Sequence, residues 1–183
     1  MAVEKKVWTT REVVYAGLFA ALTAVCAQVT IPFYPVPFTL QVLGVLLAGV
    51  VLGARTAALS QAIYLMMGAA GLPVFQGRSG GLHALVGPTG GYLAGFLLAA
   101  WIVGRLTERP EGRRGARGAV AMAAGLAAVY VPGVLVLSLH LGSLSRAAVA
   151  GFLVFLPADL IKAAVAYAVG RGLEARGVGG RLL

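Results

Sequence analysis

Charged side chains are scarce in this sequence. Only 11% of its residues are Asp, Glu, Lys or Arg, whereas a soluble domain carries about 25%. Hydrophobic residues make up 60% of the chain, and the mean hydropathy is +0.90. This composition excludes an ordinary water-soluble domain, and we predict an integral membrane protein.

Three chemical signatures are also missing. The chain has one cysteine, Cys26, so no intramolecular disulfide is possible, and we interpret this residue as packing within an apolar segment. No segment ends in the Gly-Lys-Ser/Thr of a Walker A loop, which excludes that route to ATP hydrolysis. His83 and His140 are isolated from other ligand-type residues, so we expect neither a metal nor a cofactor.

Long apolar runs separated by short connections fill most of the sequence. Continuous runs favour transmembrane helices, because the strands of a β-barrel alternate polar and apolar residues. A chain of 183 residues has room for about six such helices in one membrane domain, residues 1–183. We predict an all-α bundle with spans at 13–31, 38–53, 56–71, 88–103, 119–141 and 147–170, and an external loop at 72–87 that folds over or into the bundle.

Proline and glycine mark the predicted connections. The segment 31–38 (IPFYPVPF) contains three prolines, which stop a helix and favour an extended connection. Ala54-Arg55 is expected to form a tight turn between the second and third spans. Pro132-Gly133 is expected to interrupt the fifth span.

The basic residues crowd the ends of the apolar runs. The net charge of +9 would suggest nucleic acid in a soluble chain, but this placement is the positive-inside bias of membrane proteins, and we expect no nucleic-acid partner. With both termini in the cytoplasm, 12 of the 15 basic residues lie on that side. These are Lys5, Lys6, Arg11, Arg55, Arg105, Arg109, Arg113, Arg114, Arg117, Arg171, Arg176 and Arg181. Arg78 and Arg146 lie outside, and Lys162 lies within a span.

Two charges lie inside the last apolar run. Asp159 and Lys162 are three residues apart, which places them on one face of a helix. An ionisable group at the bilayer centre costs roughly 2.5–3.5 kcal/mol on insertion scales, so it normally faces the protein interior or an aqueous cavity. Pro157, directly before them, can bend the helix. The pair is either a structural ion pair or a polar anchor for a bound small molecule.

Polar and aromatic residues collect toward the predicted outer ends of the spans. Interface anchoring or interhelical hydrogen bonding explains each of them singly. Together with Asp159 and Lys162 they predict a cavity that opens outward, with apolar walls and a few donors and acceptors, as in a small-molecule site. The residues are Gln28, Tyr34, Gln41, Gln76, Arg78, His83 and Tyr92.

Two further patterns have competing interpretations. Gly77-Arg78-Ser79-Gly80 matches the Gly-x-Ser-Gly string of intramembrane serine proteases, but it lies in a loop and the sixth span has no histidine to act as base. A protease is therefore the least favoured function. Ala16, Ala20 and Ala24 form a stripe of small residues, which permits close packing either within the chain or on a partner subunit.

The strings AGLFAALTAVCAQVTIPFYPVPFTLQVLGVLLAGVVLG, YLMMGAAGLPVF, SGGLHALVGPTGGYLAGF and PADLIK closely resemble the BioY family. The resemblance runs from Arg11 to Gly170. The family comprises biotin-specific substrate-capture subunits (S components) of energy-coupling factor (ECF) transporters. It implies a six-helix, multi-pass protein of the bacterial or archaeal cell membrane that is not an enzyme. The implied partners are biotin, a membrane-embedded coupling subunit and a pair of ATPases.

The resemblance also implies roles for particular residues. Asp159 and Lys162 match an acidic and basic pair that contacts the ligand, and the 72–87 loop matches a segment that closes over the site. Ala16 and Ala20 match a surface for the coupling subunit, and Ala24 continues that stripe. A solitary transporter that works without ATPases is the alternative. The expected substrate-binding residues are Asp159, Lys162, Gln41, Gln76, Arg78 and Tyr92.

Overall fold

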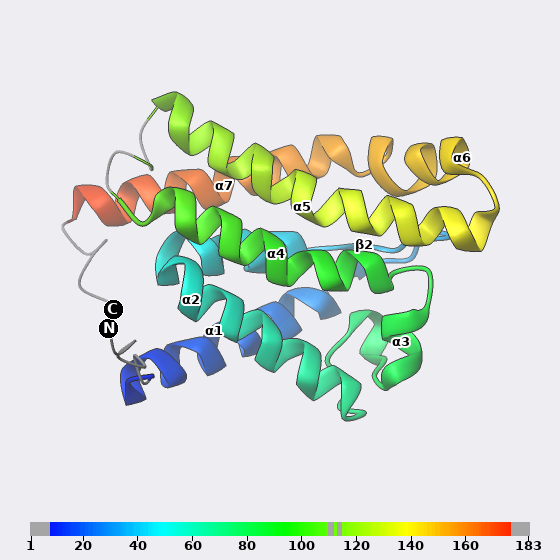
Figure 1. Cartoon of the computed structure of the whole chain (residues 1–183), viewed down its shortest axis with the longest axis horizontal. Coiled ribbons are helices and arrows are strands. Elements are labelled where there is room, and N and C mark those ends of the chain that lie inside the picture. Colours follow the sequence, from blue (N-terminus) through cyan, green and yellow to red (C-terminus); the bar gives the residue numbers. More distant parts are fainter. Residues whose placement is uncertain (1–7, 110–111, 113–114, 177–183) are drawn as a thin grey trace, which may run out of the picture.

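The computed structural model describes residues 8–109, 112 and 115–176, and most of them are helical (Figure 1). Five helices are long: α1 (Thr10–Gln28), α2 (Gln41–Ala69), α4 (Gly90–Thr107), α5 (Gly115–Leu141) and α7 (Leu156–Ala175). The short elements are η1 (Gln76–Arg78), α3 (Leu82–Val86), α6 (Leu144–Ala148) and the π-helical turn η3 (Val149–Leu153). Strands β1 (Thr30–Ile31) and β2 (Phe38–Thr39) form an antiparallel pair.

Helix α1 begins at a capping box and ends before the proline-rich segment. The Thr9 side chain accepts from the Glu12 backbone N–H at 3.2 Å, and the Glu12 carboxylate accepts from the Thr9 N–H at 2.7 Å. The chain leaves the helix after Gln28 and pairs Thr30 with Thr39 across the hairpin. The extended connection predicted for 31–38 is thus confirmed, and the first helix ends three residues earlier than the predicted span.

Helix α2 is folded back on itself at Gly53. This residue has φ 70° and ψ 172°, a conformation that glycine adopts without steric cost. The hydrogen bond from Gln41 Nε2 to Tyr64 Oη, 2.7 Å long, joins the two halves and shows that they run side by side. The predicted second and third spans are therefore present as two helical segments, and the reversal occurs at Gly53 rather than at Ala54-Arg55.

Helix α5 is continuous through Pro132, so the predicted interruption is wrong. Pro132 has no N–H, which deprives the Ala128 carbonyl of its partner within the helix. In the structure that carbonyl faces Gly95 of α4, where an added Cβ would lie 2.7 Å from the oxygen. Proline is tolerated within membrane helices that pack against neighbouring helices, as α5 packs against α4 here.

The last predicted span is a bent pair of helices. The segment Leu144–Leu153 meets Leu156–Ala175 at an angle of 44°. Pro157 lies in the first turn of α7, where its missing N–H needs no partner. The bend expected near this proline is confirmed, and it falls just before it.

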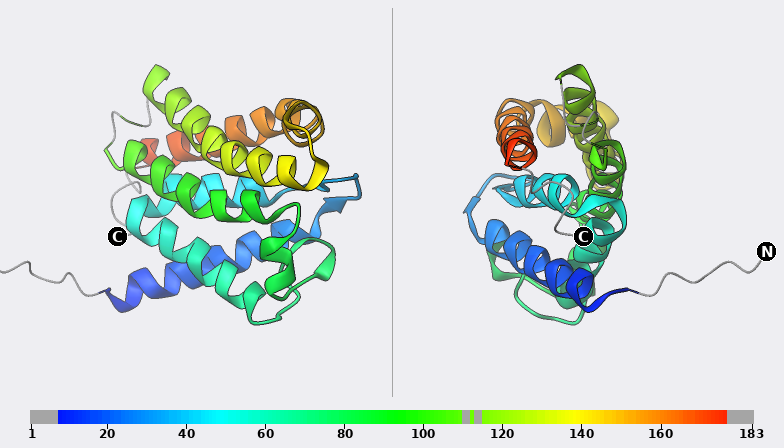
Figure 2. Two further views of the ribbon diagram at one scale, coloured as in Figure 1. Left: turned by 45° about the vertical axis from the view of Figure 1, so that its right-hand side comes forward. Right: turned by 90° about the vertical axis from the view of Figure 1, so that its left-hand side faces the viewer.

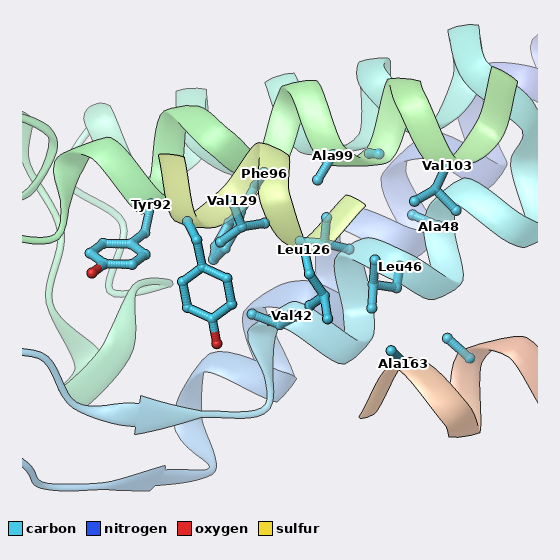
Figure 3. Packing of buried hydrophobic residues seen from close by; sticks show 14 of the residues in the cluster. Val42, Leu46, Ala48, Tyr92, Phe96, Ala99, Val103, Leu126, Val129 and Ala163 are labelled. Atoms are coloured by element: carbon cyan, nitrogen blue, oxygen red, sulfur yellow. The ribbon is translucent and has the colours of Figure 1, made fainter. Parts of the chain in front are cut away.

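The buried core lies between α2, α4, α5 and α7. Leu46 of α2, Phe96 and Val103 of α4, and Leu126 of α5 meet there (Figure 3). Figures 1 and 2 place α1 and α7 on opposite sides of α2, with the first turn of α1 and the last turn of α7 at one end of the bundle. The helices thus form one bundle around an apolar interior.

Among the described residues, α1, α2, α4 and α5 are each long and apolar enough to cross a membrane, and the bent pair that ends in α7 would be a fifth span. Because α2 reverses at Gly53, a sixth span depends on counting its two halves separately. The number of six spans and the cytoplasmic position of the termini stay predictions. Lys5, Lys6, Arg113, Arg114 and Arg181, which entered the prediction of orientation, lie outside the described residues.

Candidate functional site

A cavity lies at the end of the bundle where the hairpin, the start of α4 and the bend before α7 meet. The enclosed part of the cavity has a volume of only about 50 Å³, and the opening to the outside enlarges the free space to about 500 Å³. The cavity is therefore narrow, and a molecule inside it contacts several walls at once. The lining residues are Val36, Pro37, Thr39, Gln41, Val42, Gln76, Thr89, Tyr92, Leu93, Phe96, Val129, Tyr130, Gly151, Phe155, Asp159 and Lys162.

An ion pair forms one wall of this cavity. Lys162 Nζ lies 2.5 Å from Asp159 Oδ1, and the two residues are only 5% and 3% exposed. Lys162 Nζ also donates to the Thr39 carbonyl at 2.5 Å and lies 3.9 Å from the centre of the Phe38 ring. The second carboxylate oxygen accepts from the Tyr130 hydroxyl at 2.5 Å.

Both charged groups keep unused hydrogen-bonding capacity. An ammonium group has three N–H donors, and an ionised carboxylate has about four acceptor sites. Lys162 uses two donors, and Asp159 accepts one bond at each oxygen. The pair can therefore donate to and accept from a bound molecule without breaking the bonds that hold it in place.

The bend before α7 brings the pair to the cavity. It leaves Asp159 in the first turn of α7, where the helix dipole favours a negative charge. On the other side of the bend, the Gly151 carbonyl accepts from the Tyr92 hydroxyl at 2.9 Å. A Cβ on Gly151 would lie 2.1 Å from that hydroxyl, so the chain approaches Tyr92 this closely only because residue 151 is glycine.

A second set of polar contacts links the cavity to the 72–87 loop. Gln41 is 3% exposed, and its amide donates to Tyr64 Oη at 2.7 Å and accepts from Thr39 Oγ1 at 2.8 Å. The Tyr64 hydroxyl in turn donates to the Val74 carbonyl in the loop at 3.2 Å. The loop therefore packs against the bundle, as expected for a segment that folds over it.

Aromatic rings supply the apolar walls. Phe155 stacks on Phe38 with ring centres 6.3 Å apart and meets Phe33 edge-on at 6.2 Å. Tyr130 meets Tyr92 edge-on at 6.4 Å. Such rings can pack against the faces of a flat, uncharged ring system in a ligand, while the ion pair can form hydrogen bonds with polar atoms at the edge of that ring system.

The structure brings most of the predicted site residues together. Gln41, Gln76, Tyr92, Asp159 and Lys162 all line the cavity. Gln76 also donates to Thr89 Oγ1 at 3.2 Å, which connects the loop to the start of α4.

Arg78, the sixth predicted residue, is exposed in η1 and is not part of the cavity wall. The other polar residues of the predicted outer zone also lie away from the wall. Gln28 donates to the Phe75 carbonyl at 3.2 Å, Tyr34 is 88% exposed, and His83 is exposed on α3.

Tyr130, Phe155, Thr39 and Thr89 line the cavity but were not predicted. Tyr130 contacts Asp159 across 29 residues of sequence, and no local pattern reports such a contact. A tyrosine within an otherwise apolar helix was the only available signal, because a buried hydroxyl needs a partner.

The alanine stripe of α1 packs inside the chain. Ala16 and Ala20 have no exposed surface, and Ala24 is half-buried, on the side of α1 that meets α2. The role of Ala16, Ala20 and Ala24 in contacting a partner subunit stays a prediction. The alternative of packing within the chain applies, because small side chains let α1 and α2 approach closely.

The serine of the protease-like string has a structural role. The Ser79 hydroxyl donates to the Gln76 carbonyl at 2.8 Å and closes the η1 turn. Among the described residues, no cluster of His, Cys, Asp or Glu could hold a metal ion.

Comparison with known proteins gives consistent matches over nearly the whole chain. The family model described as "BioY family" matches residues 2–177. A biotin transporter BioY of Thermotoga maritima is 46% identical over 156 residues, which cover 85% of this chain and 91% of that protein. A biotin transporter BioY of Rhizobium etli is 39% identical over 175 residues, covering 90% of this chain and 94% of that one.

The fold is also similar to a solved structure. The crystal structure of the S-component for biotin from an ECF-type ABC transporter matches with a TM-score of 0.80 and 26% sequence identity. The match covers 96% of this chain and 95% of that one.

Proposed function

The chain belongs to the BioY family, whose members are transporters and not enzymes, and on that premise we propose that it captures biotin in this cavity for uptake across the cell membrane of a bacterium or archaeon. The observation that carries the proposal is the buried Asp159–Lys162 pair in the wall of a narrow cavity. A pair that served only to tie helices together would not need to border free space.

The chemistry of biotin fits the wall. Biotin has a ureido ring with two N–H donors and one carbonyl, an apolar fused ring and chain, and a carboxylate. Asp159 can accept from a ureido N–H, and Lys162 can donate to a carbonyl or a carboxylate. A hydrogen bond to a charged group contributes roughly 1.5–3 kcal/mol. The rings of Phe155 and Tyr92 cover the apolar part of the ligand.

Two connecting segments supply the outer cover in this proposal. Val36 and Pro37 belong to the hairpin, and Gln76 belongs to the 72–87 loop. Both segments must move apart for biotin to enter, because the cavity admits little more than water in this conformation. Arg78 lies outside the wall in this conformation, so a contact with biotin depends on the same loop movement.

Uptake against a concentration gradient needs a source of energy. The sequence has no Walker A loop. We therefore assign energy coupling to partners: a membrane-embedded coupling subunit and ATP-binding cassette ATPases, with this chain as the S component. Ala16 and Ala20 are buried in this conformation, so docking of the coupling subunit on this stripe requires α1 to shift. Uptake into proteoliposomes that contain only this chain would support the alternative, a solitary transporter.

Calorimetric titration of the detergent-purified protein with biotin tests the proposal. We expect saturable binding that Asp159→Asn weakens about ten- to a hundredfold, the equivalent of one hydrogen bond to a charged group. Glu108→Gln is the matched control, because it also replaces a carboxylate by an amide, at the distant end of α4. Absence of saturable binding, or equal affinities for the Asp159 variant and the wild type, contradicts the proposal.

A further inference from the structure

A long apolar groove lies between α5 and the bent pair of helices that ends in α7, which run side by side (Figure 1). It has a volume of about 530 Å³. Leu126 and Tyr130 of α5 are buried and form its floor, whereas Val131 and Leu160 are exposed at its rims. Both α5 and the bent pair are long and apolar enough to cross a membrane, so the groove opens on a surface that meets lipid.

The sequence of α5 explains the length of this groove. Four of its lining residues recur at every fourth position and lie along one side of the helix: Ala123, Ala127, Val131 and Leu135. The two alanines are small, which leaves free space beside the larger residues of the bent pair. Between the first and the last of these residues the helix rises about 18 Å. The hydrocarbon of one bilayer leaflet is about 15 Å thick, so the groove is as long as one acyl chain.

The width of the groove distinguishes between possible occupants. Its volume spread over that length gives a mean cross-section of roughly 30 Å², whereas an α-helix with its side chains has a cross-section of roughly 80 Å² or more. A helix of another protein is therefore too wide to enter, and a single hydrocarbon chain is not. An unfilled groove would leave the atoms of its walls without contacts on one side, which is unfavourable.

The walls of the groove also indicate what they recognise. Apart from Tyr130, every lining side chain is a hydrocarbon. The Tyr130 hydroxyl donates to Asp159 at 2.5 Å, on the side of the ring that meets the cavity. The walls therefore offer apolar contacts to a lipid tail and no charged group to a headgroup.

Among the described residues, Tyr130 alone lines both the groove and the cavity. Its ring meets Phe152, another residue of the groove, edge-on with the ring centres 4.8 Å apart. A chain that fills the groove packs behind the Tyr130 ring, on the side away from Asp159. The ring then separates the cavity from the bilayer.

We propose that this groove binds one acyl chain of a bilayer phospholipid, which packs against the back of Tyr130. The chain is recognised by its shape and not by its headgroup, because the lining side chains carry no charge. The bilayer is the source of the occupant, since the groove is continuous with the exposed apolar surface of two spans.

Photolabelling in a bilayer tests this proposal without biotin. The full chain is reconstituted into liposomes that contain phosphatidylcholine with a diazirine near the middle of one palmitoyl chain. After irradiation, the labelled positions are mapped by peptide mass spectrometry. We expect label on the floor residues Leu126 and Tyr130, which are too buried to meet lipid unless a chain enters the groove. Leu18, exposed on α1, reports ordinary lipid contact.

Ala127→Phe should remove the label from the floor and leave that on Leu18, because Ala127 lies in the middle of the groove and a phenyl ring blocks it. Ala21→Phe is the matched control, since Ala21 is an exposed alanine on α1, on the opposite side of α2 from α7 (Figure 2). This variant should keep the wild-type pattern. Ala127→Leu is a smaller block that serves if the phenylalanine variant does not fold.

Four results would overturn the proposal. An unlabelled floor with labelled rims would mean that no chain enters the groove. Floor and rims that are both unlabelled, with Leu18 labelled, would mean that a second copy of the chain or another protein covers it. Floor labelling that survives the Ala127 variants would mean that the label reaches these residues by another path. A floor labelled by photoreactive phosphatidylglycerol but not by phosphatidylcholine would place recognition at the headgroup.

Discussion

Gly151→Ala tests whether the close packing of residue 151 against Tyr92 is needed for the shape of the cavity. An ideal Cβ at this position lies 2.1 Å from the Tyr92 hydroxyl and 2.6 Å from a Leu137 methyl. The Leu137 methyl is the end of a flexible side chain and can rotate away. The Tyr92 ring cannot retreat toward α5, because it already lies against Gly133, where a Cβ would be 2.4 Å from the ring. The added methyl therefore drives Tyr92 into the cavity.

Two effects contribute to the expected free-energy cost of this substitution. The bond from Tyr92 to the Gly151 carbonyl is lost, which costs about 0.5–1.5 kcal/mol. Overpacking by one methyl costs about 1–3 kcal/mol. If the displaced ring also fills space that biotin needs, its affinity should fall at least about tenfold, which corresponds to about 1.4 kcal/mol. Calorimetric titration of the purified variant with biotin measures this change.

A double variant separates the steric cause from general damage. Tyr92→Phe removes the hydroxyl that the new methyl meets, so Gly151→Ala should cost less in the Tyr92→Phe background than in the wild type. Gly17→Ala is the control, because no atom lies within 4 Å of an added Cβ there. Wild-type affinity in Gly151→Ala, or strictly additive effects in the double variant, would refute the assignment of these two residues to the ligand's surroundings.

Three further outcomes are expected. Lys162→Met should abolish measurable biotin binding and lower the thermal unfolding midpoint in detergent, since it leaves the buried Asp159 charge without its cation; an unchanged midpoint would argue against the buried pair. Gln41→Leu breaks the link from the cavity to Tyr64 and should make the 72–87 loop more sensitive to limited proteolysis; an unaltered cleavage rate would show that the loop is held by other contacts. Gly104→Ala places a Cβ 2.4 Å from the Ala54 backbone nitrogen and should reduce the yield of folded protein by size-exclusion chromatography, whereas Gly172→Ala, which meets no atom within 4 Å, should not.

The sequence predicts best where a residue type is costly unless it has a specific environment. Asp159 and Lys162 within an apolar run required a shared interior surface, and the structure supplies it. The sequence predicts a tight turn at Ala54-Arg55, and the chain reverses at the neighbouring Gly53, which has a positive φ. In both cases, any other arrangement carries a large free-energy penalty that arises from these residues and their immediate surroundings.

Prediction fails where the outcome depends on which elements become neighbours. Small residues at Ala16 and Ala20 predict a close helix contact but not its partner, which is α2 of the same chain. Pro132 predicts a break, but α5 is continuous through it and packs closely against α4 at Gly95. Tyr130 contacts Asp159 only because α5 and α7 pack together, and the sequence of neither helix alone predicts that packing.

A structure of the protein with biotin bound tests the central claim most directly. We predict the ligand in the cavity between the hairpin, α4 and α7, with one of its polar atoms within about 3.2 Å of the Asp159 carboxylate and another within that distance of Lys162 Nζ. Biotin bound at a different place, with Asp159 and Lys162 closed on each other and touching no ligand atom, would contradict the account.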